Sequence, residues 1–161
     1  FWTGAEDDVQ DFAVGKNRIE VKTCASPSKN EVLISSLEQL YNAECPIYLA
    51  VVYLGHAAAE TPSAVSLFSL AERISNHIKK DNISAHDAFI RKLSMRGLFL
   101  DGSYNESFYL PSSFKAFSVR DEFPRITPAD IRHGISKAKY NINLSLCAGY
   151  GASMDTPFKK D

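Results

Sequence analysis

The longest hydrophobic stretch of the chain is PIYLAVVYL, residues 46–54, which contains no charged residue. An uninterrupted apolar run of this length is typical of a β-strand that is covered on both faces. The shorter run Val32-Leu33-Ile34, within a predicted strand over residues 31–35, has the same character. The pattern therefore predicts two central strands, each buried on both sides.

Residues 9–23, VQDFAVGKNRIEVKT, have the pattern of a β-hairpin. Because alternate side chains of a strand share a face, Glu20 and Lys22 are expected on one side and Ile19 and Val21 on the other. Charged groups therefore gather at one end of a hairpin whose other face is apolar. The predicted parts are a strand over residues 9–14, a turn over 15–17 and a strand over 18–23.

The rest of the chain alternates between helical and strand-like periodicity. Helices are predicted over residues 64–79 and over 84–96, the second with a Ser84–Asp87 capping box and a stop at Gly97. Further predictions are an irregular stretch over 98–113, strands over 114–120 and 138–146, and a short helix opened by a capping box over 127–130. The order indicates an α/β or α+β fold, with a mixed sheet flanked by helices. We expect one domain over residues 1–147 and a flexible tail over 148–161.

Composition narrows the class of protein without indicating its chemistry. The 161 residues are 45% hydrophobic and carry a net charge of −1, with −5 in residues 1–60 and +4 in the remainder. No apolar run is long enough for a membrane-spanning helix, so we expect no membrane partner. Three widely spaced cysteines without metal-ligand spacing are typical of a reducing cytoplasm. The chain begins with Phe-Trp and no signal-peptide pattern, so we expect it to be part of a longer polypeptide.

The hairpin carries the residues with the most suggestive chemistry, Asp11, Glu20 and Lys22. Phosphodiester hydrolysis needs a divalent cation, an activated water and positive charge near the reacting phosphate. Mg²⁺ is held by one or two carboxylates together with water and phosphate oxygens, which Asp11 and Glu20 can supply. Lys22 can orient the water or stabilise the developing charge. The alternative is a surface hairpin with a Glu20–Lys22 ion pair, worth less than about 1 kcal/mol.

These residues also carry a family resemblance. The segments DF and RIEVKT of the hairpin, followed by ISSLEQL and PIYLAVV, resemble the PD-(D/E)XK nuclease superfamily. More narrowly, the chain is similar to a bacterial family of PD-(D/E)XK proteins of unknown function. The likeness continues through FPRIT and HGISKAKYNI and covers most of residues 2–146. Gln10 stands where the family name has proline.

The resemblance implies a restriction-endonuclease-like core and Mg²⁺- or Mn²⁺-dependent cleavage of DNA in bacterial restriction or phage defence. Asp11, Glu20 and Lys22 match the catalytic positions of the superfamily, with Asp11 and Glu20 as metal ligands. Gln39 falls where several branches carry a helical glutamine near the site, although a capping role explains it equally well. A further acidic residue is expected upstream of Phe1. The alternative is an inactive nuclease-fold module that binds nucleic acid or another protein of a defence complex.

Basic residues in the second half of the chain are candidates for phosphate contacts with DNA. For any single one of them, ordinary solvated charge explains its presence as well. Ser35 can touch a phosphate or cap the turn after its strand. The basic residues are Arg120, Arg125, Arg132, Lys137 and Lys139.

Overall fold

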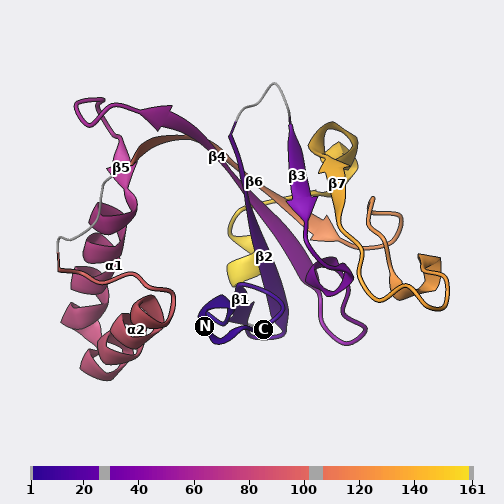
Figure 1. Ribbon diagram of the computed structural model, residues 1–161, viewed down its shortest axis with the longest axis horizontal. Helices are drawn as coiled ribbons and strands as arrows, with labels where there is room; N and C mark the ends of the chain where they lie inside the picture. The colour runs from indigo at the N-terminus through magenta and orange to yellow at the C-terminus, as the bar shows by residue number, and fades with distance from the viewer. Residues whose placement is uncertain (1, 26–29, 102–106, 160–161) are drawn as a thin grey trace. The chain divides into compact units, whose positions relative to one another are not determined.

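The computed structural model describes residues 2–25, 30–101 and 107–159 (Figure 1). Two α-helices are described, α1 (Leu67–Asp81) and α2 (Ile83–Met95). The strands are β1 (Phe12–Val14), β2 (Asn17–Cys24), β3 (Glu31–Ile34), β4 (Ile47–Ala57), β5 (Val65–Ser66), β6 (Phe108–Val119), β7 (Tyr140–Asn143) and β8 (Gly151–Ala152). Short 3₁₀ helices are η1 (Gly4–Glu6), η2 (Leu37–Leu40), η3 (Pro128–Asp130), η4 (Leu144–Tyr150) and η5 (Thr156–Phe158).

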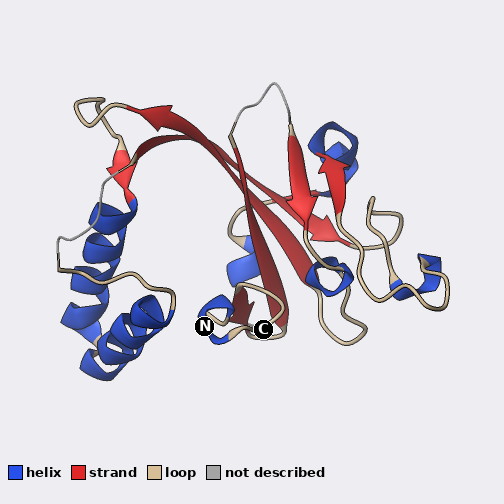
Figure 2. Ribbon diagram, viewed as in Figure 1, coloured by secondary structure: helices blue, strands red, loops and turns tan. Residues whose placement is uncertain are grey.

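The main sheet is mixed, with the strand order β1-β2-β4-β6-β5 and with β8 paired to β6 (Figure 2). Strand β1 is antiparallel to β2, whereas β2 is parallel to β4 over seven register pairs, Arg18↔Ile47 to Cys24↔Tyr53. A hairpin strand that continues into a parallel pair through a crossover gives an α/β fold. The predicted fold class, α/β with a restriction-endonuclease-like mixed sheet, is therefore confirmed.

Strand β4 lies between β2 and β6, as its apolar run predicts. Leu49 and Val51 are fully buried, and Val52 on the other face is half-buried. The strand is thus central, with one face in the core and the other partly covered. It continues three residues past the predicted end at Leu54.

Strand β3 corrects the second prediction of a central strand. Val32 and Ile34 are buried, but Leu33 between them is 51% exposed. Within the described residues β3 pairs with β7 alone, in a separate two-stranded sheet. A run of three apolar residues cannot show whether a strand is buried on both faces or on one face only. A single exposed leucine is common on protein surfaces, so Leu33 does not require a second covered face.

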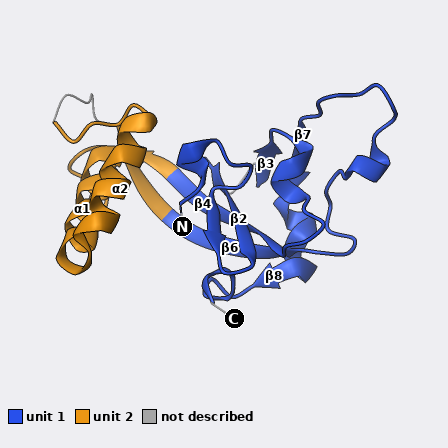
Figure 3. Cartoon of the chain, turned by 90° about the horizontal axis from the view of Figure 1, so that it is seen from below, with its two compact units in different colours: residues 1–54, 112–161 blue, residues 55–111 orange. Residues whose placement is uncertain are grey.

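The chain divides into two compact units, residues 1–54 with 112–161 (unit 1) and residues 55–111 (unit 2) (Figure 3). Unit 2 contains both α-helices. Helix α1 begins after Ser66, whose side chain accepts a hydrogen bond from the Ser69 amide, and the Ser69 side chain accepts one from the Ser66 amide. This reciprocal cap moves the start three residues beyond the prediction.

Helix α2 also begins differently from the sequence prediction. The Asn82 side chain accepts from the Ala85 amide and caps the helix, in place of the predicted Ser84–Asp87 box. The predicted stop is confirmed, since Gly97 has a φ of +73° and the Leu98 amide bonds back to the Leu93 carbonyl.

Strand β6 begins six residues before the predicted strand over residues 114–120, inside the stretch predicted to be irregular. It runs without interruption from Phe108 to Val119 through Pro111, and residues 102–106 of the predicted irregular stretch lie outside the described residues. The last predicted strand is shorter, because the Asn143 side chain accepts from the Ser145 amide and starts η4. The predicted cap over residues 127–130 is confirmed, with the Thr127 amide and hydroxyl both donating to Asp130.

The chain after Cys147 is packed rather than frayed as predicted. Gly151 and Ala152 pair with Phe117 and Ala116 of β6. Pro157 is fully buried, and its carbonyl accepts from the Asn17 side chain at 3.1 Å. These contacts are formed between residues more than 30 positions apart, so local sequence does not reveal them; residues 160–161 lie outside the described part.

Candidate active site

The β1–β2 hairpin carries the candidate site. The register pairs Phe12↔Ile19 and Val14↔Asn17 leave a two-residue turn in which Gly15 has a φ of +56°, a conformation that glycine adopts without strain. Strand β1 begins at Phe12 instead of residue 9, and the residues before it are fixed by another contact. The Asp11 carbonyl accepts from the amides of Thr3 and Gly4, which holds Asp11 directly before β1.

Glu20 and Lys22 lie on the same face of β2, as their spacing predicts. The Lys22 Nζ atom is 2.7 Å from Glu20 Oε1, and the Glu20 side chain is only 3% exposed. Glu20 neighbours Leu49 of β4 in the parallel ladder, and Leu49 is fully buried. The pair is therefore not the solvated ion pair of the alternative interpretation, because its carboxylate is inside the protein.

Asp11 faces the same end of the hairpin. Its Oδ2 atom accepts a hydrogen bond of 2.8 Å from the amide of Val21, the residue between Glu20 and Lys22. Gly4 packs so tightly against it that a Cβ atom built there would lie 2.8 Å from Asp11 Oδ1 and 3.1 Å from its Cα atom. The lack of a side chain at Gly4 therefore permits the observed position of Asp11.

Gln39 joins the cluster from η2. Its Oε1 atom accepts from Lys22 Nζ at 3.1 Å and from the Ser35 amide at 2.8 Å. The second bond is a local contact of the kind that the capping interpretation anticipates, although it reaches Ser35 instead of the N-cap Ser36. Gln39 thus serves the turn and the cluster with the same oxygen atom.

Gln10 was not identified as a site residue from the sequence, where it is notable only for replacing a proline. It is 4% exposed, and its Nε2 atom donates to the Glu38 carbonyl at 2.7 Å and to the Gln39 carbonyl at 3.5 Å. It therefore ties η2 to the residue before Asp11. The sequence alone gives no sign of this role. A prediction that Gln10 is buried beside the hairpin would have been needed to identify it.

The electrostatics of the cluster centre on Glu20. Burial raises its pKa from 4.5 to about 7; the charge of Asp11 also raises it, while the hydrogen bond and charge of Lys22 lower it. The Glu20 Oε2 atom is buried and has no hydrogen-bond partner. A buried carboxylate oxygen without a partner is costly, and a bound cation would satisfy it.

The donor set fits a divalent cation of the Mg²⁺ type. Within residues 2–25, 30–101 and 107–159 there is no group of three or more His, Cys, Asp or Glu side chains that could hold a metal ion. Mg²⁺ does not need one, because it uses one or two carboxylates and completes its shell with water and substrate oxygens. Asp11 and Glu20 would be the two carboxylates of such a site, and Glu20 Oε2 is buried without a hydrogen-bond partner.

The family comparison gives the decisive match. Residues 1–145 match the model of a family described as "Putative PD-(D/E)XK family member" (DUF4420). The chain belongs to this family. The PD-(D/E)XK superfamily suggests a nuclease-like protein, and the cluster of Asp11, Glu20 and Lys22 follows the order in its name. No curated protein and no solved structure matches the chain.

The basic residues that are candidates for phosphate contacts have different environments in this PD-(D/E)XK family member. Arg125 donates to the Leu40 carbonyl at 2.7 Å and Arg120 pairs with Asp121, so both guanidinium groups make contacts within the chain. Lys137 and Lys139 are exposed. None of the helices in the described residues is both long enough and apolar enough to span a membrane.

Proposed function

We propose that the chain is the nuclease domain of a metal-dependent DNA endonuclease. The observation that carries the proposal is the buried Glu20 carboxylate, with one oxygen atom held by Lys22 and the other without a partner, beside Asp11. An isolated ion pair would have no need for burial, because desolvation of two charges costs more than their attraction returns. Binding of a cation and a phosphate at this position would explain why the Glu20 carboxylate is buried.

Each residue has a separate role in this proposal. Asp11 and Glu20 hold the cation, Mg²⁺ or Mn²⁺, which when bound supplies Lewis acidity toward a phosphate oxygen and an incoming water. Lys22 lies between Glu20 Oε1 and Gln39 Oε1, so its ammonium group is fixed in one direction. It orients the attacking water or stabilises the charge that develops on the phosphate. Gln39 positions Lys22.

The biological setting is part of the proposal and is supported by the resemblance to nucleases. DNA cleavage by a bacterial protein of this kind serves restriction or phage defence in the cytoplasm, where other defence proteins are its expected partners. Residues 1–147 form one nuclease-like domain in this view, and unit 2 (residues 55–111), which includes the end of β4 and the start of β6, is an insertion in it. Residues 148–159 complete the packing of that domain through β8 and Pro157.

A second candidate function is a nuclease-fold module that binds nucleic acid or a partner protein without cleaving. The direct contact between Glu20 and Lys22 favours it, since each group neutralises the other when no cation is present. The two functions differ in one measurable property, cleavage that depends on Lys22.

Substitution of Lys22 tests the proposal in the intact protein. Lys22→Ala should lower the rate of DNA nicking by about 10²–10³, or about 3–4 kcal/mol, because one group that stabilises the transition state is removed. Its affinity for Mn²⁺ should stay close to that of the wild type, because lysine is not an oxygen ligand. Glu20→Ala should weaken metal binding and cleavage together.

Lys16→Ala is the matched control, since Lys16 is an exposed lysine in the turn of the same hairpin. It should leave both quantities unchanged. Cleavage by Lys22→Ala at the wild-type rate would eliminate the proposed role of Lys22. A wild-type protein that binds DNA and never cleaves it with Mg²⁺ or Mn²⁺ would favour the non-cleaving module.

A further inference from the structure

A groove lined by serine, lysine and glutamate residues lies beside the candidate site in unit 1. Strands β3 and β7 are antiparallel with the pair Ile34↔Tyr140, so the residues that follow β3 lie next to those that precede β7. Between these two segments is a cavity of about 380 Å³. Its polar lining consists of Ser35, Ser36, Glu38, Ser136, Lys137 and Lys139.

A continuous set of hydrogen bonds connects this groove to the site. The Ser35 amide donates to Gln39 Oε1 at 2.8 Å, and the same oxygen accepts from Lys22 Nζ at 3.1 Å. Lys22 in turn contacts Glu20 at 2.7 Å. The groove wall at Ser35 is therefore linked through Gln39 and Lys22 to the buried carboxylate.

The chemistry of the groove fits an extended phosphate ester. Lys137 and Lys139 are exposed and end in mobile point charges of the kind that contact backbone phosphates. Ser35 and Ser136 also line the groove, and serine hydroxyl groups are common donors to phosphate oxygens. We propose that this groove binds the sugar-phosphate backbone of the DNA strand next to the bond that is cleaved. This inference rests on the proposed function and names the part of the substrate that lies outside the metal site.

Glu38 is the one acidic side chain of the lining. Hydrogen bonds from its own backbone amide and from the Ser36 hydroxyl lower its pKa, so it carries a negative charge at neutral pH. It opposes a phosphate and offsets one of the two lysines. Neutralising Glu38 should therefore strengthen DNA binding, whereas neutralising the lysines should weaken it.

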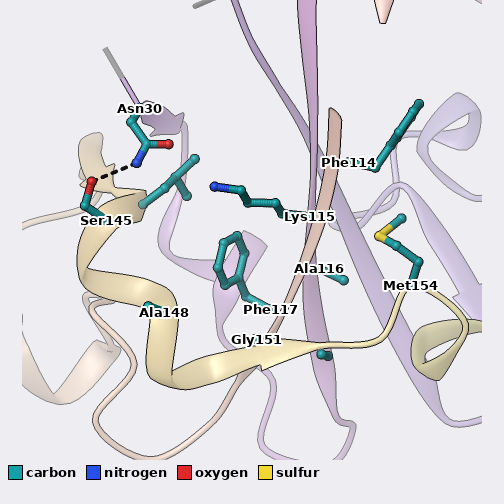
Figure 4. A pocket seen from close by; sticks show the side chains of 11 residues that line it. Asn30, Phe114, Lys115, Ala116, Phe117, Ser145, Ala148, Gly151 and Met154 are labelled. Atoms are coloured by element: carbon teal, nitrogen blue, oxygen red, sulfur yellow. Dashed lines mark hydrogen bonds between the residues drawn. The ribbon is translucent and has the colours of Figure 1, made fainter. Parts of the chain in front are cut away.

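A larger cavity lies elsewhere in unit 1, and Figure 4 shows the side chains that line it. It measures about 530 Å³, and its lining includes Phe114, Phe117, Leu144 and Met154 together with Asn30, Lys115 and Ser145. Its polar groups are already paired: Asn30 donates to Ser145 at 2.8 Å, and Lys115 lies 5.2 Å from the Tyr53 ring centroid. The groove near Ser35 is therefore the better anion site.

The test is DNA binding without cleavage, measured by fluorescence polarisation of a labelled duplex of mixed sequence in EDTA. The double variant Lys137→Gln/Lys139→Gln should bind more weakly, and the slope of log K against log salt should become shallower by about 2, near 0.9 for each phosphate that is no longer neutralised. Glu38→Gln should bind more tightly than wild type. Lys16→Gln/Lys159→Gln removes the same charge at the hairpin turn, where Asn17 contacts the Lys159 carbonyl, and should leave the slope unchanged.

The outcomes separate this inference from the proposed function. An unchanged slope in Lys137→Gln/Lys139→Gln, or an equal change in the hairpin-turn control, would overturn the groove assignment even where the wild type cleaves DNA. A tighter complex for Glu38→Gln together with a weaker one for the lysine variant would support the groove even if no cleavage were found. All five side chains are exposed, so the variants should fold, and circular dichroism checks this.

Discussion

The two compact units differ in how they bury apolar side chains. Unit 1 contains the whole of one continuous cluster of buried residues, among them Ile34, Leu49 and Tyr53. In unit 2 the helices bury only Ala71, Ser75 and Leu93. Large apolar residues are exposed in both units: in unit 2 these include Ile83 (71%) and Leu67 (59%), and in unit 1 Leu146 (72%).

The difference shows where a site of fixed geometry can be built. Glu20 and Asp11 lie on a hairpin whose Ile19 is fully buried, so their positions are set by close packing. In unit 2 the contact between the helices includes a polar pair, Ser75 Oγ with His86 Nε2 at 2.9 Å. Deleting apolar atoms should therefore be costly in unit 1 and nearly neutral at exposed positions of unit 2.

The largest expected effect comes from truncating the same residue type in each unit. Leu49→Ala should lower the free energy of unfolding by about 2–5 kcal/mol, because it leaves a cavity in the core next to Glu20. Leu67→Ala removes a side chain that is 59% exposed and should cost less than about 0.5 kcal/mol. Urea unfolding followed by circular dichroism measures both, and equal losses would show that the units do not differ as described.

The second effect is a pH dependence that originates at Glu20 in unit 1. Because the pKa of Glu20 is raised from 4.5 to about 7, the folded protein binds more protons at this group than the unfolded chain does between these values. The contribution of Glu20 to stability should therefore be greatest below pH 4.5, decline as pH rises to about 7, and stay constant above that.

The decline amounts to on the order of 3 kcal/mol at most, from 1.36 kcal/mol for each pKa unit. The measurement is the difference in unfolding free energy between wild type and Glu20→Gln across this range, without metal. Addition of Mg²⁺ should reduce the decline, because a cation favours the ionised carboxylate. A difference that does not vary with pH would mean that Glu20 is not titrating in a buried site.

The third effect compares the same substitution at one glycine in each unit. Gly4→Ala should destabilise the fold by about 1–3 kcal/mol and weaken Mn²⁺ binding, because the added Cβ meets Asp11 atoms at 2.8 and 3.1 Å. Gly55→Ala, in unit 2, is the matched control, since a Cβ there meets no atom within 4 Å. It should change neither quantity. If Gly4→Ala bound Mn²⁺ as wild type does, Asp11 would not be held in place by this contact.

The parts of the fold that could be predicted from the sequence are those with a strong local period. Alternation in the hairpin predicted that Glu20 and Lys22 would share a face, and the apolar run of residues 46–54 predicted the central position of β4. Both patterns depend only on neighbouring residues. Both predicted helices were also found. Their observed N-caps, Ser66 and Asn82, differ from the predicted starts at residues 64 and 84.

The remaining features depend on residues far apart in the chain. The burial of Pro157 depends on the hairpin turn near Asn17, and the position of η2 depends on Gln10 through a contact 28 residues away. The partner of β3 is β7, more than 100 residues later, so its one-sided burial could not be predicted locally. The contact of Ser75 with His86 was not predicted for a different reason: a single histidine gives no periodic signal.

Divalent-metal binding tests the central claim most directly. Isothermal titration of Mn²⁺ into the intact protein should show one site whose affinity increases as the pH rises from about 6 to about 8, because the cation competes with the proton on Glu20. The site should be abolished or greatly weakened in Glu20→Gln and in Asp11→Asn, and retained in Lys22→Ala. Wild-type affinity in both carboxylate variants would contradict the claim that Asp11 and Glu20 form a metal site.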